Sequence, residues 1–366
     1  MHKILLAGSF HGNNKGDELI FVCFKNFLEE NYPNNEIYVT TINPHKFSER
    51  YGVFGVDPRN VFNVFKLIKN DIDIIILAGG GTFIDYNILD TFRIKGTSQL
   101  IYWLSISLLG KIFKKKVLWI ALGAGPIKNK ITYRLIRLVG NKVDFISFRD
   151  PYSVKLIKRH CLLRIKETRD IVYTYDRKLK TTRKKKYALL IPRKTDNGVI
   201  DEKVLSIYFL ISRILIDRGF DIIVYSTNYR ADKSIIDLLS LALEKLPNSK
   251  ITVIKNDQDG IENFVELVSS SKLIVSMRMH PVILGSLSFI PSYCLSYDSK
   301  KMYYCLKDFG NEKYCLDINK KSLYIIKSFD TFLNEYKKTQ KKIKPNLAKA
   351  KKLSFQNLED ISKYLK

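Results

Sequence analysis

The chain has 366 residues, too many for one typical domain and suited to two. Hydrophobic residues make up 46%, with 21 Phe and 21 Tyr, which excludes a disordered polypeptide and allows two sizeable cores. A formal net charge of +26 favours an anionic partner, namely nucleic acid, anionic lipid headgroups, or phosphorylated and acidic sugars. The alternative is that lysine-rich, solvated helix faces account for much of this charge.

The cysteines and the apolar runs indicate the cellular compartment in which the protein acts. Five cysteines, an odd number with no C-x-x-C pair, argue against a disulfide framework or a zinc site, so we expect a reducing cytoplasm. The first apolar run, Ile4 to Ala7, is too short for a secretory leader. Leu100 to Gly110 is about half a bilayer span and predicts a buried helix; attachment to a membrane surface is the alternative.

The first half of the chain alternates strands and helices. The strands are apolar throughout, which is typical of parallel strands buried on both faces, and several end in glycines. This order predicts one Rossmann-like, doubly wound domain over residues 1–176. The predicted strands are Lys3–Gly8, Ile37–Thr41, Asp73–Ala78, Val117–Leu122 and Asp144–Phe148, and the predicted helices are Asp17–Glu30, 96–113 and Thr132–Val139.

Residues 177–186 are basic and polar and predict an exposed linker. A second series of strands and helices follows and predicts another Rossmann-like domain over residues 187–327, whose last strand is Ser292–Ser296. Residues 328–366 are lysine-rich and predict a helical region, which we expect to pack back across the first domain. The fold class is therefore α/β, with two doubly wound domains facing a cleft. Ligands of such sheets bind beyond the carboxyl ends of the strands, so the loops there are candidate sites.

The loop after the first strand, residues 8–18, contains several glycines and the asparagines Asn13 and Asn14. It offers backbone N–H groups and the positive end of the next helix to an anion or a sugar. Lys15 lacks the preceding glycines of a Walker loop, and no dinucleotide-binding motif is present. Asp17 is either a helix cap or a site residue.

Two further loops carry candidate residues of the first domain. Gly79, Gly80 and Gly81 follow one strand and indicate close approach by a ligand or by another backbone, with tight helix packing as the alternative. Asp85 comes shortly after them. Arg149 leaves another buried strand, and its guanidinium suits a carboxylate or a phosphate, although a surface salt bridge is the alternative.

The segment Ser276–Pro281 follows a strand of the second domain. Arg278 and His280 alternate, so both side chains point the same way if the segment is extended. An arginine beside a titratable histidine suits the binding of a phosphorylated acid and the transfer of a proton. The alternative for His280 is a purely structural role.

Taken in order, these motifs resemble the polysaccharide pyruvyl transferase family, from about residue 3 to residue 310. Each motif is weak alone, but the ordered set is fairly specific. The motifs are the loop 12–18, the triple glycine with Asp85, Phe148-Arg149-Asp150, Arg278-Met279-His280 and Tyr297-Asp298-Ser299-Lys300.

The resemblance implies two Rossmann-like domains arranged as in GT-B glycosyltransferases, with no metal and no cofactor. It implies phosphoenolpyruvate as donor, a glycan or lipid-linked sugar as acceptor, and a pyruvate ketal as product. Arg149 and Arg278 would bind the donor, and His280 would contact it and serve as a general acid. Asp17, Glu18 and Asp85 are candidates for the base. The other residues expected to line the substrate site are Asn14, Gly80, Gly81 and Lys300.

Two other functions fit parts of the sequence. A GT-B glycosyltransferase with a nucleotide-sugar donor has the same architecture, so the fold does not separate it from a pyruvyl transferase. A basic nucleic-acid-binding protein fits the charge, but no helix-turn-helix, zinc finger or RNA-binding aromatic signature is present, so we expect no nucleic-acid partner. Contact with the anionic inner face of a membrane carrying a lipid-linked precursor is a hypothesis compatible with the charge.

Overall fold

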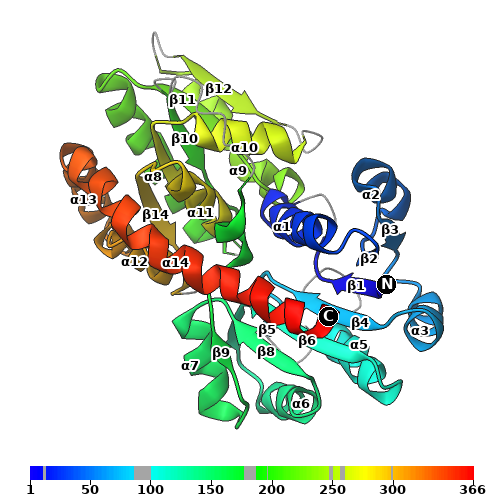
Figure 1. Cartoon of the computed structure of the whole chain (residues 1–366). Helices are drawn as coiled ribbons and strands as arrows, with labels where there is room; N and C mark the ends of the chain where they lie inside the picture. Colours follow the sequence, from blue (N-terminus) through cyan, green and yellow to red (C-terminus); the bar gives the residue numbers. More distant parts are fainter. Residues whose placement is uncertain are drawn as a thin grey trace. The chain divides into compact units, whose positions relative to one another are not determined.

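The computed structural model describes residues 1–10, 14–85, 100–176, 187–195, 197–246, 250–255, 260–297 and 300–366 (Figure 1). By its internal contacts the chain divides into two compact units. The N-terminal unit consists of Met1–Gly12, Asp17–Thr174 and Lys351–Lys366, and the C-terminal unit of Asn13–Gly16 and Tyr175–Ala350. The basic linker predicted at 177–186 lies outside the described residues.

The N-terminal unit contains a parallel sheet in the order β3-β2-β1-β4-β6-β8-β9. Its central strand β4 is apolar and buried along its whole length, and β6 is buried after Lys116, as expected of parallel strands covered on both faces. A short parallel pair, β5 and β7, follows the carboxyl ends of β4 and β6. The bounds are β1 Lys3–Ala7, β2 Glu36–Thr40, β3 Phe54–Val56, β4 Ile74–Ala78, β5 Phe83–Asp85, β6 Lys116–Leu122, β7 Ala124–Ile127, β8 Phe145–Phe148 and β9 Lys166–Glu167.

Helices connect these strands and bury their apolar side chains against the sheet. Helix α3 packs against α5, and together with the sheet they enclose a core that includes Ile75 and Trp119. The helices of this unit are α1 Lys15–Asn31, α2 Pro44–Tyr51, α3 Val61–Asn70, α5 Leu100–Ile112, α6 Lys130–Gly140 and α7 Pro151–His160. The predicted helices are confirmed where the structure describes them, residues 96–99 of the second lying outside the described residues, whereas α2, α3 and α7 were not predicted.

The C-terminal unit contains a second parallel sheet, in the order β12-β11-β10-β13-β14-β15. Ser292–Ser296 is not its last strand, because β15 adds to the edge beyond it. The strands are β10 Tyr187–Ile191, β11 Asp221–Tyr225, β12 Ile251–Ile254, β13 Leu273–Ser276, β14 Ser292–Ser296 and β15 Cys315–Asp317. The helices are α8 Gly198–Asp217, α9 Tyr229–Leu243, α10 Ile261–Ser269, α11 Met279–Leu287, α12 Lys301–Lys307 and α13 Ser322–Asn334.

The C-terminal helix α14, Tyr336–Leu365, contributes to both units. Its first half belongs to the C-terminal unit, where the Tyr336 hydroxyl donates to the Lys272 carbonyl at 2.8 Å. Its last turns belong to the N-terminal unit, where the Ser147 hydroxyl donates to Asn357 at 2.8 Å and Lys166 pairs with Asp360. Helical structure starts at α13 in residue 322, earlier than the predicted 328. No helix in the described part of the chain is long and apolar enough to cross a membrane.

In both sheets the strand order runs outward in two directions from one central pair. The pair is β1 and β4 in the N-terminal unit and β10 and β13 in the C-terminal unit. Loops that leave such a pair at its carboxyl end turn to opposite sides of the sheet, which opens a crevice for ligands. The predicted site residues lie mainly on these loops, so the two doubly wound sheets place them where α/β proteins bind their ligands.

Candidate functional site

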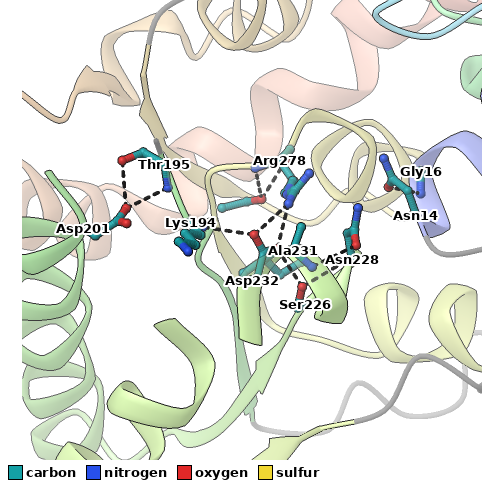
Figure 2. Close-up of polar contacts among 12 residues, drawn as sticks. Asn14, Gly16, Lys194, Thr195, Asp201, Ser226, Asn228, Ala231, Asp232 and Arg278 are labelled. Atoms are coloured by element: carbon teal, nitrogen blue, oxygen red, sulfur yellow. Dashed lines mark hydrogen bonds and ion pairs between the residues drawn. The ribbon is translucent and has the colours of Figure 1, made fainter. Parts of the chain in front are cut away.

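Arg278 is held by a buried carboxylate at the carboxyl ends of β10, β11 and β13 in the C-terminal unit (Figure 2). Its Nη2 donates to both oxygens of Asp232, at 2.9 and 2.7 Å. Asp232 lies in the first turn of α9 and is fully buried. It also accepts from the backbone N–H of Lys194 at 3.0 Å and from the Ser226 hydroxyl at 2.7 Å. One carboxylate therefore ties together the loops that follow β10, β11 and β13.

Asp232, Ser226 and Lys194 were not predicted from the sequence. An acidic residue in the first turn of a helix ordinarily complements the helix dipole, so its sequence position gives no sign of a second role. A buried charge is costly unless it is paired and hydrogen-bonded, and Asp232 meets both conditions through Arg278 and two neutral donors. The arginine side chain keeps 17% of its surface exposed.

The prediction that the Arg278 and His280 side chains point the same way from an extended segment is wrong. Helix α11 begins at Met279, with Arg278 as its N-cap residue, so His280 is the second residue of a helix and the segment is not extended. Residues two apart on a helix do not face each other. The Arg278 backbone is fixed by Ser276, whose hydroxyl accepts from Arg278 N at 2.9 Å and donates to its carbonyl at 2.8 Å.

His280 packs against the first turn of α1. A β-carbon at Gly16 would lie 2.0 Å from His280 Nδ1, so the ring occupies the space that any side chain at position 16 would need. The Asn14 carboxamide caps this turn by accepting from Gly16 N at 3.0 Å, and Lys15 N donates to the Thr227 carbonyl at 2.8 Å. The first loop and the Arg278–His280 segment, predicted separately, thus meet within the C-terminal unit.

Lys300 stands apart from this group. It is exposed and precedes α12, and its carbonyl accepts from Tyr304 N at 3.0 Å. Asp298 and Ser299 of the same motif lie outside the described residues, as do His11, Gly12 and Asn13 of the first loop. A substrate-binding role for Lys300 stays a prediction.

The triple-glycine loop of the N-terminal unit needs glycine for two reasons. Gly79 and Gly80 have φ of +45° and +76°, a conformation that other residues rarely adopt. A β-carbon at Gly79 would meet Ile20 of α1 at 2.8 Å, which supports the packing alternative for that residue. A β-carbon at Gly80 would stand 3.5 Å from Asp17 Oδ1, so Gly80 and Asp17 are neighbours. Gly81 is half-buried in the same loop.

Two of the three candidate bases are now better defined. Asp17 does not cap α1, because the helix begins at Lys15 and Asn14 supplies the cap. Glu18 is fully buried, pairs with Arg50 at 3.2 Å, and accepts a hydrogen bond from Tyr51. Its carboxylate is thus already engaged in structural contacts.

Asp85 is fully buried at the end of β5. Its Oδ2 accepts from the Thr132 hydroxyl at 2.6 Å, while Oδ1 has no hydrogen-bond partner among the residues that the structure describes. A buried carboxylate oxygen without a protein donor is costly. A role for Asp85 in activating the acceptor stays a prediction.

Arg149 lies in a buried ion pair. Its Nη1 contacts Asp170 at 2.6 Å, and the two side chains are 5% and 4% exposed. A β-carbon at Gly123 would lie 2.8 Å from Arg149 Nε, so the guanidinium also lies on that backbone. These contacts favour a structural salt bridge for Arg149, although the bridge is buried and not at the surface as the alternative had it. A donor-binding role for Arg149 stays a prediction.

Within the described ranges, no group of three or more His, Cys, Asp or Glu side chains could hold a metal ion.

Comparison with known families gives a match to polysaccharide pyruvyl transferase over residues 14–299, most of the chain. The chain belongs to the polysaccharide pyruvyl transferase family. The resemblance inferred from the motifs is confirmed, and the matched span includes Asp85, Arg149, Asp232, Arg278 and His280. It ends just before Lys300. This family membership places the protein among the transferases.

Solved structures show the fold of this pyruvyl transferase family member. S. aureus MnaA, solved with UDP, aligns with a TM-score of 0.67 at 12% identity, covering 100% of this chain and 97% of MnaA. UDP-GlcNAc 2-epimerase from Neisseria meningitidis aligns at 0.61 and 13%, covering 99% and 100%. A glycosyltransferase from Rickettsia africae aligns at 0.61 and 14%, covering 100% and 99%. No curated protein sequence matches significantly. The predicted GT-B-like class with two Rossmann-like sheets is confirmed.

Proposed function

We propose that the protein transfers the pyruvyl group of phosphoenolpyruvate to a sugar of a cell-surface glycan or of its lipid-linked precursor, forming a pyruvate ketal. Family membership supports the transfer. The observation that carries the donor assignment is the Arg278–Asp232 pair at the carboxyl ends of β10, β11 and β13, directly before the helix that bears His280. There the helices α8, α9 and α11 begin after neighbouring strands, and their N-termini favour an anion.

The chemistry needs a proton donor and groups that neutralise a highly charged anion. Protonation of the methylene carbon of phosphoenolpyruvate makes C2 electrophilic. One sugar hydroxyl attacks C2, the C2–O bond to phosphate breaks, and a second hydroxyl closes the ketal. The two hydroxyls lose two protons, of which one balances that placed on the methyl group and the other leaves with phosphate. Positioned acids, bases and cations accelerate such steps.

We assign these roles as follows. Arg278 binds the donor's phosphate or carboxylate, and Asp232 orients the guanidinium fork for this purpose. His280 contacts the donor and supplies the proton, with its ring held by the first turn of α1. Asp85 and Asp17 are the candidates for activating the acceptor hydroxyl, because Glu18 is engaged by Arg50 and Tyr51.

The second candidate is transfer of a sugar from a nucleotide-sugar. Two similar structures favour it, MnaA solved with UDP and the Neisseria epimerase solved with UDP-GlcNAc. At 12% and 13% sequence identity, this similarity shows a shared fold but does not identify the donor substrate. The family match favours pyruvyl transfer.

Because the proposed acceptor is a glycan or its lipid-linked precursor, we expect the protein to act in the cytoplasm, at the inner face of the membrane. We expect it to need no metal and no cofactor and to bind no nucleic acid. Lysine and arginine outnumber acidic residues by 62 to 36, and such an excess attracts anionic lipid surfaces.

The test is product formation. Protein is incubated with phosphoenolpyruvate and a panel of glycans and lipid-linked sugars, and phosphate release is followed together with the mass of the acceptor. We expect release to depend on one acceptor, which gains a single ketal-linked pyruvate, and to be abolished in His280→Gln. Acceptor-dependent sugar transfer from a nucleotide-sugar, without any from phosphoenolpyruvate, would refute the proposal.

A further inference from the structure

Helix α3 of the N-terminal unit exposes large apolar side chains. Val61 and Phe62 are 58% and 73% exposed, and Phe65 is 37% exposed, whereas Val64 and Ile68 are buried against the core. The helix thus buries one face and directs a second apolar stripe outward. Scattered exposed hydrophobic residues are ordinary, but a contiguous group marks an interaction surface.

The apolar surface extends beyond α3 to its neighbour α5. The rings of Phe65 and Phe113 lie 5.4 Å apart, edge to face, and Ile112 beside Phe113 is 61% exposed at the end of α5. We name the exposed residues Val61, Phe62, Phe65 and Ile112 the α3 face.

Lysines flank the α3 face. Lys66 and Lys69 project from α3, and Lys114, Lys115 and Lys116 follow α5. Lys114 has φ of +58°, a left-handed conformation at which glycine is preferred after a helix, so the backbone does not account for a lysine there. Of the nearby acids, Asp57 is paired with Arg59 at 2.7 Å, Asp144 lies 3.9 Å from Lys116 and 2.7 Å from Lys111, and Asp71 follows α3. The balance of charge is positive.

We propose that the α3 face binds the surface of an anionic phospholipid bilayer. Aromatic and aliphatic side chains enter the boundary between headgroups and acyl chains, while lysines at their border contact lipid phosphates. A protein partner fits less well, because protein interfaces contain less lysine than the rest of a protein surface, whereas lysines around an apolar face favour anionic headgroups. The binding is independent of the proposed transfer reaction, although it would hold the protein where a lipid-linked acceptor is embedded.

Vesicle flotation tests the proposal with the full-length protein. Vesicles of phosphatidylcholine alone are compared with vesicles that also contain phosphatidylglycerol, without any sugar or phosphoenolpyruvate. We expect binding to the anionic vesicles that weakens with added salt. Phe62→Ser should lower the partition coefficient about tenfold, from the loss of buried aromatic area. Lys114→Gly should lower the partition coefficient about fivefold. Because glycine adopts the positive φ at this position without strain, this variant should fold at least as well as the wild type.

The matched control is Leu241→Ser, which removes a 58% exposed leucine from α9 of the C-terminal unit and should leave the partition coefficient unchanged. Failure of the wild type to bind anionic vesicles at low salt would overturn the proposal, as would equal losses in Phe62→Ser and Leu241→Ser. A dimer in sedimentation equilibrium that dissociates in Phe62→Ser would make the α3 face a contact between copies. Because no substrate is present, none of these results bears on the transfer reaction.

Discussion

The ring of His280 lies against the α-carbon of Gly16, so that a β-carbon there would stand 2.0 Å from Nδ1. Gly16 is not one of the glycines with a positive φ, so the backbone conformation does not require glycine at this position. The requirement comes from the histidine. The first turn of α1 therefore positions the imidazole that we assign as the proton donor.

Gly16→Ala should displace His280 and lower turnover with phosphoenolpyruvate by roughly 100-fold, since an ångström of misplacement has that order of effect. The helix should tolerate the change, because alanine is the better helix former. The measurement is steady-state phosphate release together with the thermal midpoint. Gly52→Ala is the control: a β-carbon there meets nothing within 4 Å, and the φ of +66° at this residue after α2 should lower the thermal midpoint while turnover stays unchanged. Equal activities of the two variants would contradict the positioning role.

Asp232→Ala should lower the free energy of unfolding by about 3 to 5 kcal/mol, because it leaves Arg278 without its buried counterion. Urea denaturation measures this change. The control is Asp330→Ala, which removes a carboxylate 2.7 Å from Arg218 at a site where both side chains are nearly half exposed. That exposed pair should contribute less than about 1 kcal/mol. Similar losses in both variants would show that Asp232 does not anchor Arg278.

Stability should decrease at alkaline pH. Burial raises the pKa of the thiols Cys23 and Cys294, and that of Cys315 to about 12. These groups stay neutral in the folded state but ionise in the unfolded state above their ordinary pKa, so the stability is fully present below about pH 8.5 and is lost as pH rises. Urea midpoints should be flat from pH 7 to 8 and fall above pH 9, with a shallower slope in Cys315→Ala. A flat profile to pH 10 would contradict the buried thiols.

Arg149→Ala should destabilise the protein by about 3 kcal/mol, because Asp170 would remain buried without its partner. Circular dichroism during thermal unfolding gives the change. If Arg149 also binds the donor, as the motif suggests, phosphoenolpyruvate affinity will fall at temperatures where the variant is folded. An unchanged affinity would restrict Arg149 to its structural ion pair.

The sequence was sufficient for the parts of the fold that are set by local pattern. Ile74–Ala78 and Tyr187–Ile191 are continuous apolar runs, and each is a buried parallel strand. Helix α3 escaped prediction because Phe62 and Phe65 point outward and obscure the apolar periodicity. Strand β9 has only two residues, too few for any pattern.

The candidate site was predicted only in part, because its contacts join distant residues. Arg278 and His280 were identified from their positions after a strand. Asp232 reads as a routine acidic residue of a helix start, and its pairing with Arg278 depends on the sheet order that brings β11 and β13 to either side of β10. The contact of Gly16 with His280 likewise arises only once α1 and α11 are folded.

Direct binding of phosphoenolpyruvate is the most direct test of the central assignment. Isothermal titration without metal compares the wild type with Arg278→Lys and His280→Gln, and with the exposed control Arg218→Lys. In Arg278→Lys a cation stays beside Asp232, but the paired N–H donors of the guanidinium are lost, so the affinity for phosphoenolpyruvate should fall about tenfold. The control Arg218→Lys should bind phosphoenolpyruvate as the wild type does. Saturable binding with this pattern is the predicted result. A folded wild type that ignores phosphoenolpyruvate but binds UDP tightly would contradict the pyruvyl donor and favour a nucleotide-sugar.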